Sequence, residues 1–226
     1  MARRALLTGN TRKGDKILRD FAAQQSQVAI TIVPDIVAPE AYHAAIQGTP
    51  PPFDTVYNTA SPFTYRNVGS NLQFLEPAIK GTLNLLKAVK DNAPNVKRVI
   101  WTGSCASVID YDNLVSDPPR LYTEADWNRL HGKGSARGSV DSLQSYISDL
   151  DESNSRLWKL CFSSTKDASM PYIPVHTCVD VRDLADAQFR AMIVPEAGNQ
   201  RFVLCARQYS FQDICDILRS HFTSPN

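Results

Sequence analysis

The chain has 226 residues, of which 43% are hydrophobic and 21% charged, and its formal net charge is +1. This composition is ordinary for a globular protein, and a chain so close to neutral has no field that would attract nucleic acid or an anionic membrane. No apolar run reaches the length of a membrane span, and the apolar stretch at the N-terminus is too short for a signal peptide. We therefore expect a cytoplasmic protein that binds a small-molecule ligand or substrate, binds no nucleic acid or membrane, and could form a homo-oligomer.

The cysteines and histidines indicate neither a disulfide framework nor a metal site. The five cysteines form no Cys-x-x-Cys pair and fall mostly inside apolar runs, so we expect reduced core residues. They are Cys105, Cys161, Cys178, Cys205 and Cys215. The four histidines are scattered without the spacing of metal ligands, so no metal is expected.

Strand-forming and helix-forming segments alternate in the first half of the chain. Apolar runs of β-forming composition predict strands at residues 28–33, 55–59 and 98–102. Helical periodicity predicts an early helix before the first strand and a long helix from about residue 71 to 91. The early helix has one shared apolar face, which consists of Ile17, Leu18, Phe21 and Ala22.

The same alternation returns near the C-terminus. A weaker apolar run predicts a strand at 175–181, and Asp180 is placed to cap the helix that follows. A further strand is expected at 201–205, and Ser210 can cap a last helix. Between the two halves, residues 110–157 hold almost no sustained apolar pattern and are expected to be irregular.

This alternation indicates an α/β fold, in which a doubly wound parallel sheet has helices on both faces. We expect one domain over residues 1–226. In such sheets, ligands bind beyond the carboxyl ends of the strands. That rule directs attention to residues 58–63 and 102–106, which follow the two best strands.

The second of these segments carries a Thr-Gly-Ser turn, which is where an α/β reductase usually holds its catalytic serine. Ser104 stands at that place, and a catalytic serine there would need a tyrosine with a lysine four residues later as its partner pair. None of the nine lysines has a tyrosine four positions before it. Tyr111 and Tyr122 follow the turn and are considered as substitute acids, but we expect both to be surface or packing residues.

Six segments carry a family resemblance through their sequence, order and spacing. They lie at residues 32–36, 53–63, 77–87, 96–104, 122–128 and 179–185. The chain resembles the extended short-chain dehydrogenase/reductases, in the NAD-dependent epimerase/dehydratase family. Its nearest likeness is to fungal aldehyde and ketone reductases of the dihydroflavonol and methylglyoxal reductase type. The resemblance implies a Rossmann-like fold and hydride transfer from NADPH to a carbonyl group.

The chain departs from this family at two functional motifs. The family opens with a glycine-rich loop that holds the cofactor's pyrophosphate at a helix N-terminus, but Gly9 and Gly14 have the wrong spacing for it. The family's Tyr-x-x-x-Lys pair is also missing. The fold expected from the resemblance is therefore a truncated Rossmann-like sheet, and the losses are either evolutionary or those of a shortened gene product.

The resemblance also assigns roles to particular residues. Ser104 aligns with the serine that holds the carbonyl oxygen, although a structural role in the turn is favoured over a retained polarising role. The positions that the resemblance assigns to cofactor contact fall in three segments. They are Lys13; Asn58, Thr59, Ala60 and Ser61; and Thr102 and Gly103. For residues 58–61, a packing role is favoured over cofactor contact.

Three functions remain open. The first is a degenerate family member without redox activity, either a pseudoenzyme or a cofactor-free cyclase or isomerase of specialised metabolism, and it implies that no cofactor binds. The second is an NADPH-dependent reductase of a small aldehyde or ketone, with NADP as cofactor. The third is a binding or regulatory module that binds a ligand without turnover.

Overall fold

The computed structural model describes residues 4–9, 19–20, 30–47, 53–60, 72–110, 120–128 and 177–221. The chain divides into two compact units. Unit 1 comprises residues 1–103 and 191–198, and unit 2 comprises residues 104–190 and 199–226. The expectation of a single domain stays a prediction. No helix within the described ranges is long and apolar enough to cross a membrane.

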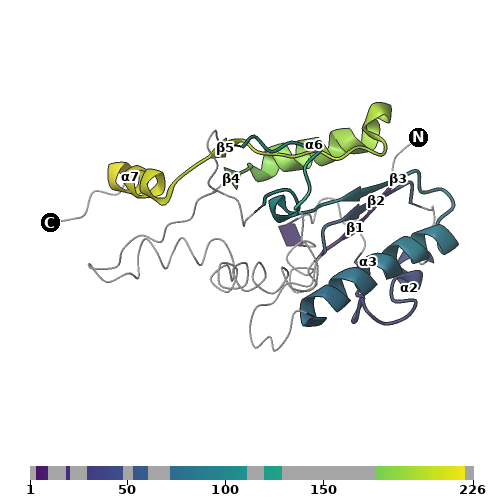
Figure 1. Cartoon of the computed structure of the whole chain (residues 1–226). Helices are drawn as coiled ribbons and strands as arrows, with labels where there is room; N and C mark the ends of the chain where they lie inside the picture. Colours follow the sequence, from purple (N-terminus) through teal and green to yellow (C-terminus); the bar gives the residue numbers. More distant parts are fainter. Residues whose placement is uncertain are drawn as a thin grey trace. The chain divides into compact units, whose positions relative to one another are not determined.

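Unit 1 is built on a three-stranded parallel sheet (Figure 1). Its strands are β1 (Ala5–Thr8), β2 (Thr55–Asn58) and β3 (Arg98–Trp101), with β2 in the middle. Thr8 of β1 and Trp101 of β3 are both register partners of Asn58, so the three strands end together at one edge. The parallel α/β sheet inferred from the sequence is confirmed.

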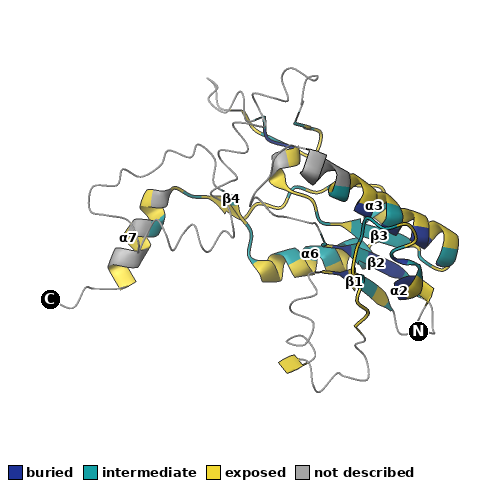
Figure 2. Cartoon of the chain, turned by 90° about the horizontal axis from the view of Figure 1, so that it is seen from below, coloured by how far each residue is buried: buried dark blue, intermediate teal, exposed yellow. Residues whose placement is uncertain are grey.

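Two helices cover one face of this sheet. They are α3 (Leu72–Asn92), which confirms the long helix predicted there, and the short α2 (His43–Gln47). Val56 of β2 and Leu85 of α3 are fully buried in the shared core, and Figure 2 shows the dark blue of buried residues on β2 and α3. A Cβ on Gly81 would lie 2.7 Å from Cδ1 of Ile36, so the glycine allows α3 to approach the segment before α2 closely.

The opposite face of the sheet receives the end of α6 (Val181–Ile193), the part of that helix that belongs to unit 1. Neighbouring side chains on a strand point to opposite faces. Val99 packs against the core that contains α3, so Arg98 points to the other face. There its guanidinium donates hydrogen bonds to the carbonyl oxygens of Ala191, Val194 (2.6 Å) and Pro195 (3.2 Å). Helices on both faces of the sheet are thus observed.

Unit 2 contains a two-stranded antiparallel pair and two helix N-termini. The strands are β4 (Thr177–Cys178) and β5 (Arg207–Gln208), and the last helix is α7 (Phe211–His221). Asp180 accepts a hydrogen bond of 2.8 Å from the backbone N–H of Arg182, which confirms its role as the cap of α6. Ser210 caps α7 as predicted, because its hydroxyl oxygen accepts a bond of 3.1 Å from the N–H of Asp213.

Three expectations about strands are corrected. Residues 30–33 form no strand, and residues 28–29 lie outside the described ranges. Residues 201–205 form no strand either; the pairing occurs at β5 instead. The strand predicted at 175–181 is reduced to β4, whose partner is antiparallel rather than a member of the parallel sheet.

Of the early helix, only residues 19–20 are described, and they are helical. Its four predicted apolar residues lie outside the described ranges.

The prediction of buried cysteines is wrong for every cysteine whose side chain is described. Cys105, Cys178 and Cys205 are free and exposed. Cys105 stands in a 3-10 turn, and Cys178 lies in a strand with a single two-residue partner, so neither has a second layer to cover it. The side chains of Cys161 and Cys215 are outside the described set.

Candidate functional site

The hydroxyl of Thr8 organises the carboxyl edge of the sheet in unit 1. It donates a hydrogen bond of 2.7 Å to Oδ1 of Asn58, a residue that is only 4% exposed. The same oxygen accepts hydrogen bonds from the backbone N–H groups of Thr59 (3.2 Å) and Ala60 (3.1 Å). The end of β1 is therefore bonded to the segment that follows β2, at the edge where ligands bind in parallel sheets.

Further bonds extend this edge to β3. The hydroxyl of Thr59 donates to the carbonyl oxygen of Thr8, and the backbone N–H of Thr102 donates to the carbonyl oxygen of Asn58 at 3.0 Å. Gly9 and Gly103 follow the ends of β1 and β3, and a Cβ at either would meet no atom of the described residues within 4 Å. The backbone at both glycines is thus open to a ligand.

Four of the residues that the sequence proposes as cofactor contacts lie together at this edge, and their role in binding stays a prediction. Asn58, Thr59, Ala60 and Thr102 lie in one hydrogen-bonded cluster, and Gly103 follows directly. The structure also brings in Thr8, which was not among the predicted site residues. Its position at the end of β1, before a glycine, is the signal that could have identified it. Lys13 and Ser61 lie outside the described residues.

Ser104 begins a tight turn in unit 2. The turn contains the 3-10 helix η3 (Cys105–Ser107), and Ser104 is exposed. Its carbonyl oxygen accepts hydrogen bonds from the backbone N–H (3.0 Å) and the hydroxyl (2.7 Å) of Ser107. The backbone of Ser104 is therefore fixed by its own turn, while its side chain stands at an exposed position.

The segment 120–128 is bonded to the last residue of this turn and to Asp110, which follows it. The backbone N–H of Asn128 donates to the carbonyl oxygen of Ser107 at 2.8 Å. The hydroxyl of Tyr122 accepts a bond of 3.2 Å from the N–H of Asp110 and donates at 3.4 Å to the carbonyl oxygen of the same residue. The hydroxyl of Tyr122 is thus engaged by the backbone of Asp110, and its expected role as a surface or packing residue stays a prediction. Tyr111 lies outside the described residues.

Arg201 holds this segment from the far end of the sequence. Its guanidinium stacks on Trp127, with 3.7 Å between Cζ and the ring centroid, and donates to the carbonyl oxygens of Glu124 and Asp126. Its Nη1 atom is buried and has no hydrogen-bond partner among the residues that the structure describes. Sequence reasoning missed this contact because it placed Arg201 at the start of a strand.

Two carboxylates of the segment are stabilised in their charged form. The pKa of Asp126 is lowered, first by the backbone N–H of Thr123 and then by the guanidinium of Arg120 at 2.6 Å. The pKa of Glu124 is lowered chiefly by the backbone N–H of Val203. Both groups hold the loop in place as acceptors and are not proton donors near neutral pH.

Sequence comparison finds relatives among fungal oxidoreductases. The ketoreductase azaE of Aspergillus niger is 28% identical over 92% of this chain and 72% of its own length. No family model matches the chain.

Structure comparison finds the same group of proteins. Gre2 from Candida albicans in complex with NADPH has a TM-score of 0.76 and 23% identity, and the match covers 96% of this chain and 75% of Gre2. The yeast methylglyoxal/isovaleraldehyde reductase Gre2 complexed with NADPH has a TM-score of 0.77 and 22% identity, with the same coverage. Identities this low establish the fold alone. The chain is therefore similar to fungal oxidoreductases in both sequence and fold.

Proposed function

We propose that this chain binds NADPH at the carboxyl edge of the β1–β3 sheet and reduces a small aldehyde or ketone. The observation that carries the proposal is the similarity to a ketoreductase over 92% of the chain. Fold neighbours crystallised with NADPH support it further. These relatives favour the reductase alternative over the expectation of a protein without redox activity, and they give no support to the expectation that no cofactor binds.

The described residues at this edge fit a dinucleotide. Open backbone at Gly9 and Gly103 leaves room for close approach, which phosphate and sugar groups require. The polar cluster around Asn58 and Thr59 can hydrogen-bond ribose hydroxyls. In this proposal Asn58, Thr59, Ala60, Thr102 and Gly103 hold the cofactor, together with Lys13 and Ser61 from the resemblance.

The chain's own contribution to the chemistry is assigned to Ser104. NADPH, when bound, supplies the hydride for the carbonyl carbon. The hydroxyl of Ser104 donates a hydrogen bond to the carbonyl oxygen and stabilises the negative charge that develops there. The fixed backbone of the Ser104 turn restricts where that hydroxyl can lie, which favours such a role.

A second candidate is NADPH binding without turnover. It is favoured by one sequence observation, namely that none of the nine lysines follows a tyrosine at the spacing that relatives of this type use for proton donation. The two candidates share a cofactor site and differ only in catalysis, so a single pair of assays separates them.

The test measures NADPH binding and NADPH oxidation on the purified chain, with methylglyoxal and a panel of small aldehydes and ketones. We expect saturable binding and carbonyl-dependent oxidation. Ser104→Ala should lower kcat by roughly 10²–10³-fold, the usual effect of losing one oxyanion donor. Ser220→Ala, an exposed serine of α7, is the matched control and should have no effect. Binding without oxidation would select the second candidate, and a folded chain that does neither would overturn both.

A further inference from the structure

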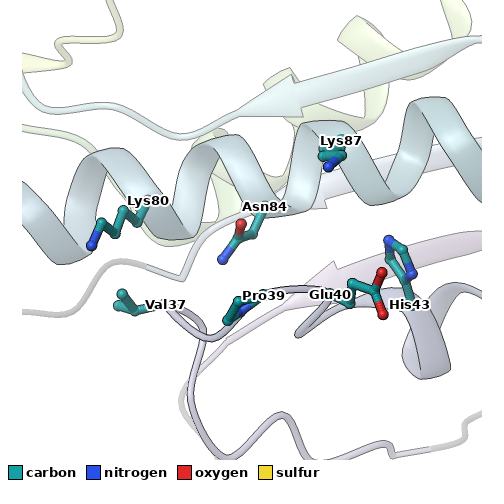
Figure 3. Close-up of a pocket in the computed structure, with 7 residues that line it drawn as sticks. All are labelled: Val37, Pro39, Glu40, His43, Lys80, Asn84 and Lys87. Carbon is teal, nitrogen blue, oxygen red and sulfur yellow. The ribbon is translucent and has the colours of Figure 1, made fainter.

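A hollow of about 430 Å³ lies on the flank of unit 1, between α3 and the segment that leads into α2 (Figure 3). It is lined by Val37, Pro39, Glu40, His43, Lys80, Asn84 and Lys87. None of these residues belongs to the hydrogen-bonded cluster at the carboxyl edge of the sheet. Its volume falls in the range of small-molecule sites, about 300–1,000 Å³.

The walls of the hollow are fixed by hydrogen bonds. Nδ2 of Asn84, in α3, donates to the carbonyl oxygens of Ile36 and Ala38, both at 2.9 Å. The backbone N–H of Val37 donates to Oδ1 of Asp35 at 2.8 Å. With the close approach at Gly81, these bonds hold the segment against α3. The hollow therefore exists before any ligand arrives, and binding needs little ordering of the protein.

Several polar groups of the lining have no partner among the described residues. Across the described part of the chain, no side chain pairs with the ammonium of Lys87, the ring of His43 or the carboxylate of Glu40. Both N–H groups of Asn84 are engaged, but its Oδ1 accepts no hydrogen bond from the described residues. Figure 3 shows Lys87 and Asn84 on the helix side, and Glu40 and His43 on the opposite wall.

These groups specify the chemistry of an occupant. Lys87 and the ring of His43 can donate to an anion, and Lys80 adds a second positive charge to the lining. Glu40 and Oδ1 of Asn84 are acceptors, so the occupant must also carry hydroxyl donors. Val37 and Pro39 supply apolar surface of the kind that packs against a carbon skeleton.

We propose that the hollow binds a small phosphorylated polyol, such as a sugar phosphate. The phosphate contacts Lys87 and His43, and the hydroxyls donate to Glu40 and Asn84. Glu40 is a non-glycine residue with a φ of 60°, a backbone conformation that L residues rarely adopt, and its side chain belongs to the lining. The proposal does not depend on the proposed reductase function.

The test is a titration of the ¹⁵N-labelled chain with glucose 6-phosphate, followed on the side-chain amide of Asn84 and the ring of His43. We expect saturable shifts, with inorganic phosphate weaker and glucose without effect. Lys87→Gln should weaken the binding of glucose 6-phosphate roughly tenfold, which is the effect of losing one charge-assisted hydrogen bond. Lys90→Gln, an exposed lysine of α3 outside the lining, is the control and should change nothing.

A further variant tests the role of the carboxylate. Glu40→Gln removes a charge that repels phosphate, so inorganic phosphate should bind more tightly and the preference for glucose 6-phosphate should fall. Equal binding of glucose 6-phosphate and inorganic phosphate by the original chain would show a general anion site and overturn the assignment. Absence of shifts in the folded chain, or equal losses in the Lys87 and Lys90 variants, would overturn it as well.

Discussion

The hydroxyl of Thr8 has three hydrogen-bonded partners at the carboxyl edge, and the backbone carbonyl of Thr8 adds a fourth bond. The hydroxyl donates to Asn58 and accepts from Thr59 and Ala60, and the carbonyl oxygen accepts from the Thr59 hydroxyl. Thr8→Val keeps the shape but leaves the buried Asn58 side chain and two backbone N–H groups without this partner. A buried or partly buried polar group that loses its hydrogen-bond partner costs about 1–3 kcal/mol. We therefore expect a loss of roughly 2–4 kcal/mol in the free energy of unfolding. Urea denaturation measures this free energy. Thr8→Ser should recover most of the loss. An unchanged unfolding midpoint for Thr8→Val would show that the hydroxyl does not organise the edge.

Arg201 acts on the segment 120–128 in the same way, through stacking on Trp127 and bonds to two carbonyl oxygens. Arg201→Met removes both kinds of contact, so the segment should open more often. We expect faster hydrogen exchange at the amide of Asn128, which donates to Ser107, and altered Trp127 fluorescence. Arg207→Met, an exposed arginine in β5, is the control. Equal exchange rates in the two variants would contradict the assigned role of Arg201.

At the scale of elements, Arg98 fixes the end of α6 to the sheet. Its guanidinium satisfies carbonyl groups at a helix C-terminus, where a positive charge is also favoured by the helix dipole. A hydrogen bond to a charged group contributes about 1.5–3 kcal/mol to stability. Arg98→Met should therefore lower the free energy of unfolding by at least the contribution of one such bond. Arg190→Met breaks only the exposed pair with Asp186 and should cost about 0–1 kcal/mol. Similar losses for both variants would argue against the anchoring role of Arg98.

The N-terminus of α7 should depend on pH through Asp213. Its carboxylate accepts from the backbone N–H and the hydroxyl of Ser210, both at 2.7 Å, and these bonds lower its pKa. A carboxyl group whose pKa is lower in the folded chain stabilises it above its ordinary pKa, and the contribution is lost as the pH falls through the folded value. We expect the amide of Ser210 to lose protection as the pH drops below about 4. Asp213→Asn should remove this dependence, whereas Asp216→Asn should retain it; a pH-independent Ser210 amide in the original chain would refute the assignment.

The elements that the sequence predicted well are those with local signals. Apolar spacing sufficed for α3, and the caps Asp180 and Ser210 were visible as single residues before a periodic run. The apolar run at 201–205 was misread as a strand. Its composition favours β structure, but a strand also needs a neighbour to bond with, and composition contains no information about that neighbour.

For the whole molecule, topology made the position of the candidate site predictable, while its function stays a prediction. The rule that ligands bind beyond the carboxyl ends of parallel strands directed attention to residues 58–63 and 102–106, and the structure joins Asn58 and Thr102 by a hydrogen bond. It could not identify the clamp of Arg201 on Trp127, because that contact joins residues far apart in the sequence without a shared motif. The predicted loss of redox activity rested on absent motifs, and the relatives favour the reductase instead.

The central claim is that the edge formed by Thr8, Asn58 and Gly103 is a cofactor site, and NADPH titration of the ¹⁵N-labelled chain tests it most directly. The account predicts saturable shifts at the amides of Gly9, Thr59, Ala60 and Gly103, and weaker binding by Thr8→Val than by Thr8→Ser. A cooperatively folded chain whose amides at this edge do not respond to NADPH would contradict the account.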